Sequence, residues 1–376
     1  MSNNVLRPAL IAAFGVMLSL PMFASAAVVN STTTATADFT VPQAFASNTT
    51  TGTSSATANT TSKSTSTNIA KFDASTGVLT GVKVNVASQY KQSTTLAAPG
   101  VAGNSGKKDA AGTGTGSLQI SLPGASAPAT WTTTAQPLTC DGKRDVGCSA
   151  STAPGKTTVD GTLTAGALDQ YVGAGTSFAV NTQATVAART TNNTFASATT
   201  TSTLDWTGTL SATYEYLLHA AQSFEDGSSA LTLNLDFGSV YLGDSAADQL
   251  FSIFNGKGAR VGLQLTNVSE TGSGNGMFST NLDTYNNIAA GGSQGFKASF
   301  LASQLGSFST TYQLTLADLA PSTYAANTLY SGYGLTLNLA GNVIARPVQN
   351  DVPEPATLML LGLGAAAFGV SRKRKA

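Results

Sequence analysis

Few residues of this 376-residue sequence could carry acid–base or nucleophilic chemistry, and its one histidine is His219. The segment Gly291-Gly292-Ser293-Gln294-Gly295 fits the G-x-S-x-G pattern of a serine nucleophile. That chemistry needs a strand before the serine, a helix after it and a histidine downstream. His219 lies upstream, and residues 296–300 have the pattern of a strand. We therefore predict a turn between strands at Ser293 and a packing role at a domain junction for His219.

Two other patterns could suggest chemistry in a glycine-rich stretch. Ser105-Gly106-Lys107-Lys108 fits S-x-x-K but lacks the partner motifs of that chemistry, and the glycines of residues 100–108 are spaced too widely for a phosphate loop. Neither pattern predicts a catalytic or nucleotide site.

Acidic residues are the remaining candidates for a metal or catalytic site. They lack the D-x-D-x-D-G spacing of a calcium loop, although calcium held by loop carboxylates and a glycosidase-type carboxylate pair remain alternatives. We predict no enzyme activity, no cofactor and no metal site. The acidic residues are Glu225, Asp226, Asp236, Asp244 and Asp248.

The two cysteines, Cys140 and Cys148, flank a short polar segment. An even cysteine count at close spacing indicates a disulfide in an exported protein. A metal pair is the weaker alternative, because no histidine or further cysteine lies near enough in the sequence to complete four ligands. We predict a disulfide that closes a nine-residue hairpin loop.

The composition excludes several classes of protein. Only 10% of the residues are charged, too few for a coiled coil or helical bundle. Of the 19 basic residues, Arg7 and four tail residues lie in segments that we expect to be removed, which leaves 14; without Asp351 and Glu354, 17 of the 19 acidic residues remain. The resulting charge of about −3 does not suit nucleic acid or anionic lipid.

The N-terminus has the order of a secretion signal. Arg7 precedes an apolar run over residues 9–20, and the small residues Ala24, Ser25 and Ala26 precede Ala27. This pattern predicts residues 1–26 as a signal peptide, cleaved between Ala26 and Ala27. The partners would be the Sec translocon and signal peptidase.

The last residues change character abruptly. Pro353, Glu354 and Pro355 precede an uncharged run over residues 356–370 and the basic residues 372–375. As a helix this run would span only about 22 Å, short of the roughly 30 Å hydrocarbon core. The basic end would stay in the cytoplasm by the positive-inside rule, so the body of the protein would lie outside.

This tail resembles the PEP-CTERM sorting signal of Gram-negative bacteria. The resemblance rests on Pro353, Glu354 and Pro355, the apolar residues 358–370, and the basic end that includes Arg372, Lys373 and Arg374. It implies a sorting tail at residues 347–376 that pauses in the inner membrane and is removed by an exosortase. These residues would then be substrate, and the protein would reach the cell surface, outer membrane or extracellular matrix.

Residues 27–67 consist mostly of Thr, Ser, Ala and Asn, with little large apolar surface. Such a segment buries too little area to offset chain entropy, which predicts a flexible spacer with at most an edge strand near Phe39. Residues 100–116 and 132–155 lack periodicity and are predicted as surface loops. A short helix is expected near residues 244–254.

Beyond residue 68, apolar and polar residues alternate with period two. The clearest case sets Leu204, Trp206, Leu210, Ala212 and Tyr214 against polar neighbours, which predicts half-buried antiparallel strands. Leu231–Leu235 also recurs as Leu335–Leu339, a single echo that does not establish a repeat array. The prediction is an all-β protein with one or two sandwich or jelly-roll domains and a short C-terminal hydrophobic helix.

Residues 68–216 resemble the choice-of-anchor E type of exported β-domain through residues 72–82 and Tyr214-Glu215-Tyr216. Residues 217–346 resemble the sandwich domains that precede sorting tails, through Leu235–Gly238, Phe251–Asn255 and Gly306–Phe308. Together these resemblances imply a non-enzymatic structural protein of the cell surface or biofilm matrix. The alternative is a surface adhesin that binds an exopolysaccharide.

Overall fold

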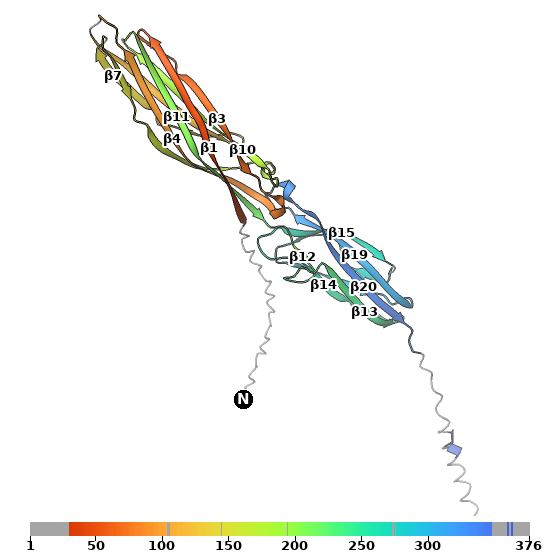
Figure 1. Cartoon of the computed structure of the whole chain (residues 1–376). Helices are drawn as coiled ribbons and strands as arrows, with labels where there is room; N and C mark the ends of the chain where they lie inside the picture. Colours follow the sequence, from red (N-terminus) through yellow and green to blue (C-terminus); the bar gives the residue numbers. More distant parts are fainter. Residues whose placement is uncertain are drawn as a thin grey trace, which may run out of the picture.

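The computed structural model describes residues 30–347 except 104, 105, 144, 194, 273 and 275, together with residues 359, 360, 362 and 363. Almost every regular element is a strand, which confirms the all-β class. The strands form two sandwiches arranged end to end (Figure 1). Among the described residues, no helix combines the length and apolar character needed to cross a bilayer.

The first domain pairs a five-stranded sheet with a six-stranded sheet. In the first sheet β11 lies between β1 and β4, and in the second sheet β10 lies between β5 and β3. The first sheet contains β1 (Ser31–Thr51), β4 (Val78–Pro99), β8 (Gly147–Ser151), β9 (Gly155–Thr164) and β11 (Ser197–Leu217). The second contains β2 (Ser54–Ser55), β3 (Asn59–Ala70), β5 (Lys107–Ser121), β6 (Ala129–Thr132), β7 (Gln136–Lys143) and β10 (Ser177–Asn192). Two short 3-10 helices are η1 (Ala74–Thr76) and η2 (Leu168–Tyr171).

The alternation predicted for β11 is confirmed. Leu204, Trp206 and Leu210 are fully buried between the sheets, while Thr207 is exposed on the opposite face. The indole Nε1–H of Trp206 donates to the Ser88 hydroxyl at 3.0 Å, so its one polar atom is satisfied. This strand anchors the core of the first domain.

The prediction of a flexible spacer over residues 27–67 is wrong for the described residues that form strands, whereas the edge strand expected near Phe39 is present as part of β1. Residues 31–51 form β1, which pairs with β11 along its length, and residues 59–70 form β3 against β10. Inward positions in the second half of β1 hold small or polar residues such as Ala46 and Asn48, which gave no hydrophobic signal but are buried. Phe39 and Val41 anchor β1 in the apolar core, and pairing with β11 orders the rest of the strand, where the inward residues are small or polar.

The predicted loops over residues 100–116 and 132–155 are also corrected, because they contain most of β5 and all of β7 and β8. The glycines of β5 face inward, where the sheets approach closely. A Cβ atom built at Gly114 would lie 2.0 Å from the Thr94 hydroxyl oxygen, which rules out a larger side chain there. The adjacent inner layer is polar, with Thr94 and Ser202 hydroxyls 3.1 Å apart. Small residues thus replace a large apolar core in this half of the domain.

The second domain pairs a four-stranded sheet with a five-stranded sheet. The first contains β12 (Gln222–Ser223), β14 (Gln249–Asn255), β16 (Phe278–Thr280) and β18 (Ser293–Phe300). The second contains β13 (Thr232–Tyr241), β15 (Gly262–Gly272), β17 (Tyr285–Ile288), β19 (Gly306–Leu319) and β20 (Ser331–Ile344), and η3 (Ala326–Thr328) precedes β20.

The helix predicted near residues 244–254 is wrong, since β14 begins at Gln249. Phe251, Ile253 and Asn255 alternate into the core along this strand. The predicted C-terminal hydrophobic helix lies almost entirely outside the described residues; Met359, Leu360, Gly362 and Leu363 are helical.

The echoed sequences Leu231–Leu235 and Leu335–Leu339 lie beside each other. β13 and β20 are parallel, and each residue from Thr232 to Leu235 pairs with the equivalent residue of the second copy, Thr336 to Leu339. The register is therefore fixed so that like residues share a face.

Candidate functional site

The residues predicted to direct export and sorting lie outside the described part of the chain. They are Ala24, Ala26, Ala27, Pro353, Glu354, Pro355, Arg372, Lys373 and Arg374. Two features of the folded part are candidates for a functional role: the disulfide and the junction of the two domains.

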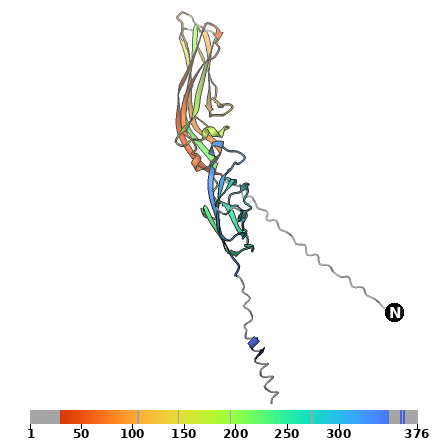
Figure 2. The same ribbon diagram turned by 90° about the vertical axis from the view of Figure 1, so that its right-hand side faces the viewer.

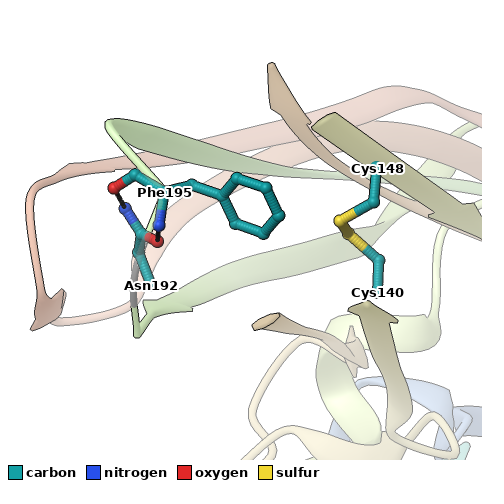
Figure 3. The surroundings of a disulfide bond; sticks show 4 residues. All are labelled: Cys140, Cys148, Asn192 and Phe195. Carbon is teal, nitrogen blue, oxygen red and sulfur yellow. Dashed lines mark hydrogen bonds between the residues drawn. A yellow bond between two sulfur atoms is a disulfide. The ribbon is translucent and has the colours of Figure 1, made fainter. Parts of the chain in front are cut away.

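Cys140 and Cys148 form a disulfide at the end of the first domain farthest from the second (Figures 1 and 3). The Phe195 ring packs beside it in a small apolar cluster with Leu96 and Ala198. The turn that carries Phe195 is closed by Asn192, whose side chain donates to the Phe195 carbonyl at 2.8 Å and accepts from its N–H at 2.9 Å. The end of the sandwich is thus braced covalently and by packing.

The disulfide does not close a β-hairpin, which corrects that part of the prediction. Cys140 lies in β7, which pairs with β5 in one sheet, whereas Cys148 lies in β8, which pairs with β4 in the other. The sequence segment between the cysteines crosses from sheet to sheet. The bond therefore links the two layers of the sandwich.

His219 lies at the junction between the domains, just after β11 ends at Leu217. Its Nδ1 lies 2.7 Å from Oδ2 of Asp318 on β19, and its Nε2 lies 2.8 Å from the Ala74 carbonyl oxygen on η1. Ala74 belongs to the first domain and Asp318 to the second. One imidazole ring therefore bridges the two domains.

The geometry favours the protonated form of this ring. Its nitrogens face a carboxylate oxygen and a carbonyl oxygen, and both can accept only when both nitrogens carry a proton. The hydrogen bond to Asp318 raises the pKa of His219, burial opposes it, and the bond to Ala74 raises it further. The pKa of His219 therefore lies above that of an ordinary histidine.

Asp318 is fully buried and holds the junction together. Burial alone would raise its pKa, but four donors outweigh burial and hold the pKa below the usual range. Besides His219, the donors are the N–H groups of Ala220 and Tyr330 and the Tyr333 hydroxyl, each at 2.9 Å. Both carboxylate oxygens are thus satisfied, so the buried charge is compensated.

Further bonds cross the same junction. The Ala325 N–H donates to the Leu79 carbonyl at 2.9 Å, and the Leu79 N–H donates to the Thr328 hydroxyl at 3.2 Å. The Asn327 N–H donates to the Asp169 carboxylate at 3.2 Å. The domains are joined by several independent contacts as well as by the chain.

A pocket of about 490 Å³ opens beside His219. Ala74 and Ser75 line it from the first domain, and Tyr330 and Tyr333 line it from the second. Tyr330 is 51% exposed, and the centroids of the two tyrosine rings lie 4.7 Å apart. The pocket therefore offers an aromatic surface next to the His219 ring.

The sequence predicted a junction role for His219 but did not single out Asp318. A signal was present, because Asp318 continues the inward face of Tyr312, Leu314 and Leu316 along β19. A carboxylate at such a position must find buried donors. Tyr333 continues the inward alternation of Leu335 and Leu337 at the start of β20, whereas Tyr330 lies in the irregular segment before that strand.

The acidic residues considered for a metal site are dispersed. Asp226 pairs with Lys257, Asp244 with Arg346 and Asp248 with Lys297. Asp236 accepts from the Gly238 N–H, and Glu225 accepts from the Ser228 hydroxyl. Within the described ranges, no three potential metal ligands gather in one place.

Comparison with solved structures gives low similarity. The chain aligns with a PapD-like domain of human CEP192 (TM-score 0.26, 11% identity, 34% of this chain and 87% of that one) and with WR4, a C. elegans MSP family member (TM-score 0.20, 11% identity, 30% and 92%). It also aligns with the VesB protease of Vibrio cholerae (TM-score 0.21, 15% identity, 36% and 37%). These scores carry no functional argument. No curated protein sequence matches.

The resemblance of residues 68–216 to choice-of-anchor E domains stays a prediction. The resemblance of the tail is confirmed, because residues 351–375 match the PEP-CTERM protein-sorting motif. Proteins with this motif are exported, processed by an exosortase and sorted to the cell surface. The chain therefore carries an exosortase-dependent sorting tail behind two β-domains.

Proposed function

We propose that the mature chain is a non-enzymatic structural protein of the cell surface or biofilm matrix, in which the two domains form a rod. The observation that carries this proposal is the bonded junction between domains arranged end to end (Figures 1 and 2). The disulfide-braced end lies at one extreme of the rod, and the residues that lead to the sorting tail lie at the other.

The junction leaves no free linker between the domains. β11 of the first domain ends at Leu217, and the next residue, Leu218, already donates to the Ala259 carbonyl of the second domain at 2.7 Å. His219 then bonds both domains. A short, fully bonded connection favours a stiff spacer over two independently moving modules.

The placement of the candidate catalytic residues supports a non-enzymatic role. Ser293 begins β18 and is followed by strand, not by the helix that a nucleophile elbow requires. Both nitrogens of His219 are engaged in hydrogen bonds at the junction, to the Asp318 carboxylate and the Ala74 carbonyl.

A second candidate function is adhesion to an exopolysaccharide. Tyr330 is half exposed at the rim of the junction pocket, and aromatic faces at such sites can bind sugar rings. In this case the rod would also carry a ligand site midway along its length.

Fractionation of cells and glycan binding by the mature protein separate these functions. A structural role predicts enrichment in the surface or matrix fraction, loss of matrix cohesion on deletion, and no saturable glycan binding. Adhesion predicts saturable binding that is lost in Tyr330→Ser and retained in Tyr241→Ser, a matched tyrosine that does not line the junction pocket. A soluble, evenly dispersed protein whose deletion leaves the matrix unchanged would contradict the structural proposal.

A further inference from the structure

Five apolar side chains are exposed at the end of the second domain where the chain leads to the sorting tail. Leu301 is 59% exposed and Leu305 is 56% exposed, and the other three are also solvent-accessible. We call this set the apolar end. Its members are Tyr241, Leu242, Leu301, Leu305 and Ile344.

Backbone contacts bring these residues together from three parts of the sequence. The Leu242 N–H donates to the Ile344 carbonyl at 2.9 Å, and the next N–H, of Gly243, donates to the Ala302 carbonyl at 2.9 Å. Tyr241 is paired with Ile344 across β13 and β20, and Gly306, which follows Leu305, is paired with Val343. Backbone pairing thus gathers these five residues at one end of the second domain.

The length of the chain beyond this surface limits its distance from the membrane. Ile344 ends β20, and nine residues, 347–355, separate Arg346 from the apolar run that begins at Ala356. The ten steps from Arg346 to Ala356 span at most about 36 Å when extended. While the run at residues 356–370 lies in the bilayer, the end of the domain at Arg346 is therefore held within about 36 Å of the lipid surface.

We propose that in the precursor the apolar end rests on the lipid surface of the membrane, with its leucines at the interface. This rests on the proposed sorting function, because the tail supplies the tether. A few apolar side chains bind lipid only weakly on their own, but a short tether raises their effective concentration at the surface. Tyr241 has the ring and hydroxyl that favour the interface between water and lipid.

Size and charge favour lipid over another protein as the occupant. Five partly exposed side chains fall well short of the roughly 800 Å² per partner of a stable protein interface. The charged residues beside them, Asp244 and Arg346, pair with each other. With a net charge of about −3 over the mature region, attraction to anionic lipid is absent, so the contact should be apolar and insensitive to salt.

Environment-sensitive labels on the full-length precursor test this contact. A label on Gln304→Cys, in the exposed turn between Leu301 and Leu305, is compared with one on Lys63→Cys, on β3 of the first domain. In vesicles of phosphatidylethanolamine and phosphatidylglycerol, the Gln304 label should shift to the blue and be quenched by nitroxide lipids. The Lys63 label should remain aqueous, and salt should change neither signal.

A triple variant and a matched control test the side chains. Leu242→Ser/Leu301→Ser/Leu305→Ser should lower the lipid-quenched fraction by about tenfold, since it removes most of the apolar area. Leu250→Ser changes a leucine that is 80% exposed on β14, outside the apolar end, and should leave the quenching unchanged.

Protection of the basic end from added protease reports tail insertion in the same sample. An aqueous Gln304 label with a protected tail would overturn lipid contact while leaving the sorting function standing. Crosslinking of two chains through Gln304→Cys, without lipid quenching of the label, would also overturn the proposed lipid contact. It would assign the surface to a second copy of the chain. An unprotected tail would overturn both the tether and the sorting function.

Discussion

Asn338 donates from its amide Nδ2 to the amide Oδ1 of Asn234 at 2.8 Å, and the two residues occupy equivalent positions in the echoed sequences of β20 and β13. The Asn338 Oδ1 in turn accepts from the Thr311 hydroxyl at 2.8 Å on the third strand. The chain of hydrogen bonds therefore has a direction, from β19 through β20 to β13.

This direction predicts unequal effects of two similar substitutions. Asn234→Asp keeps an acceptor opposite Asn338 and should change the free energy of unfolding little. Asn338→Asp removes the donor and sets two acceptors against each other, which should cost about 1 kcal/mol. Denaturant unfolding of both variants measures the difference, and equal values would contradict the assigned direction.

The junction predicts a dependence of stability on pH. The pKa of His219 is raised in the folded protein, so its contribution is present below the ordinary value and is lost as pH rises through the folded value. The pKa of Asp318 is lowered, so its contribution is lost only as pH falls through that lower value. The melting temperature should therefore be higher near about pH 5.5 than near about pH 8.5.

His219→Phe keeps a ring at the junction but cannot titrate, and it should remove most of this pH difference. Since the sequence has one histidine, no other side chain of this type can reproduce the effect. A variant that keeps the wild-type difference would show that the junction does not titrate.

Asp318→Asn should lower the free energy of unfolding by about 3 kcal/mol or more. This loss should exceed that of His219→Phe. The neutral amide cannot accept from all four donors, and its own N–H groups would face them within a buried site. Thermal unfolding measures the loss. Asp248→Asn removes a carboxylate from an exposed ion pair and should have little effect.

Loss of the disulfide should loosen one end of the rod without unfolding it. The closed loop of nine residues is expected to contribute about 2–3 kcal/mol. In Cys140→Ser/Cys148→Ser, hydrogen exchange should rise in β7 and β8, while the junction around His219 stays protected. Exchange that rises equally in both domains would contradict a local bracing role.

Because the two sheets approach closely at Gly114, a larger side chain there should strongly lower the free energy of unfolding. Gly114→Val would drive a branched side chain into the Thr94 and Ser202 hydroxyls and should cost about 3 kcal/mol, near the upper end for overpacking. Thr115→Val changes the next residue on the exposed face and should be nearly neutral. Denaturant unfolding compares the two variants.

Processing of the tail should depend on its two prolines. Pro353→Ala/Pro355→Ala should let the helix extend backwards over Glu354, because proline disfavours helix in the residue before it. The precursor should then be exported but accumulate in the membrane with its basic end in the cytoplasm. Pro347→Ala, outside the motif, is the control; normal processing of the double variant, measured by intact mass, would show that the prolines are not the recognised element.

Sequence patterning predicted the strands with large inward side chains and missed those without them. Leu204, Trp206 and Leu210 mark β11 by their alternation. Its neighbour β1 buries Phe39 and Val41 in its first half but only Ala and small polar residues such as Asn48 in its second half. A pattern of Ala, Thr and Asn does not differ from that of a flexible segment. Its order comes from pairing with β11, which is a tertiary effect.

At the junction too, sequence patterning could not reveal the partners that tertiary contacts supply. A lone histidine directly after a strand at a domain boundary was enough to suggest packing for His219. Its partner Ala74 is 145 residues away in sequence and contributes only a carbonyl oxygen, which no side-chain pattern can reveal.

The small, hydroxyl-rich inner layer between Gly114, Thr94 and Ser202 affects how the first domain responds to temperature. Unfolding exposes less apolar surface there than in an ordinary core, and exposure of polar groups lowers the heat capacity where apolar exposure would raise it. The heat capacity change of unfolding per residue should therefore be small, and the curve of stability against temperature should be flat. Such a domain gains only modest maximum stability, but it keeps that stability in the cold, where proteins held by large apolar cores weaken.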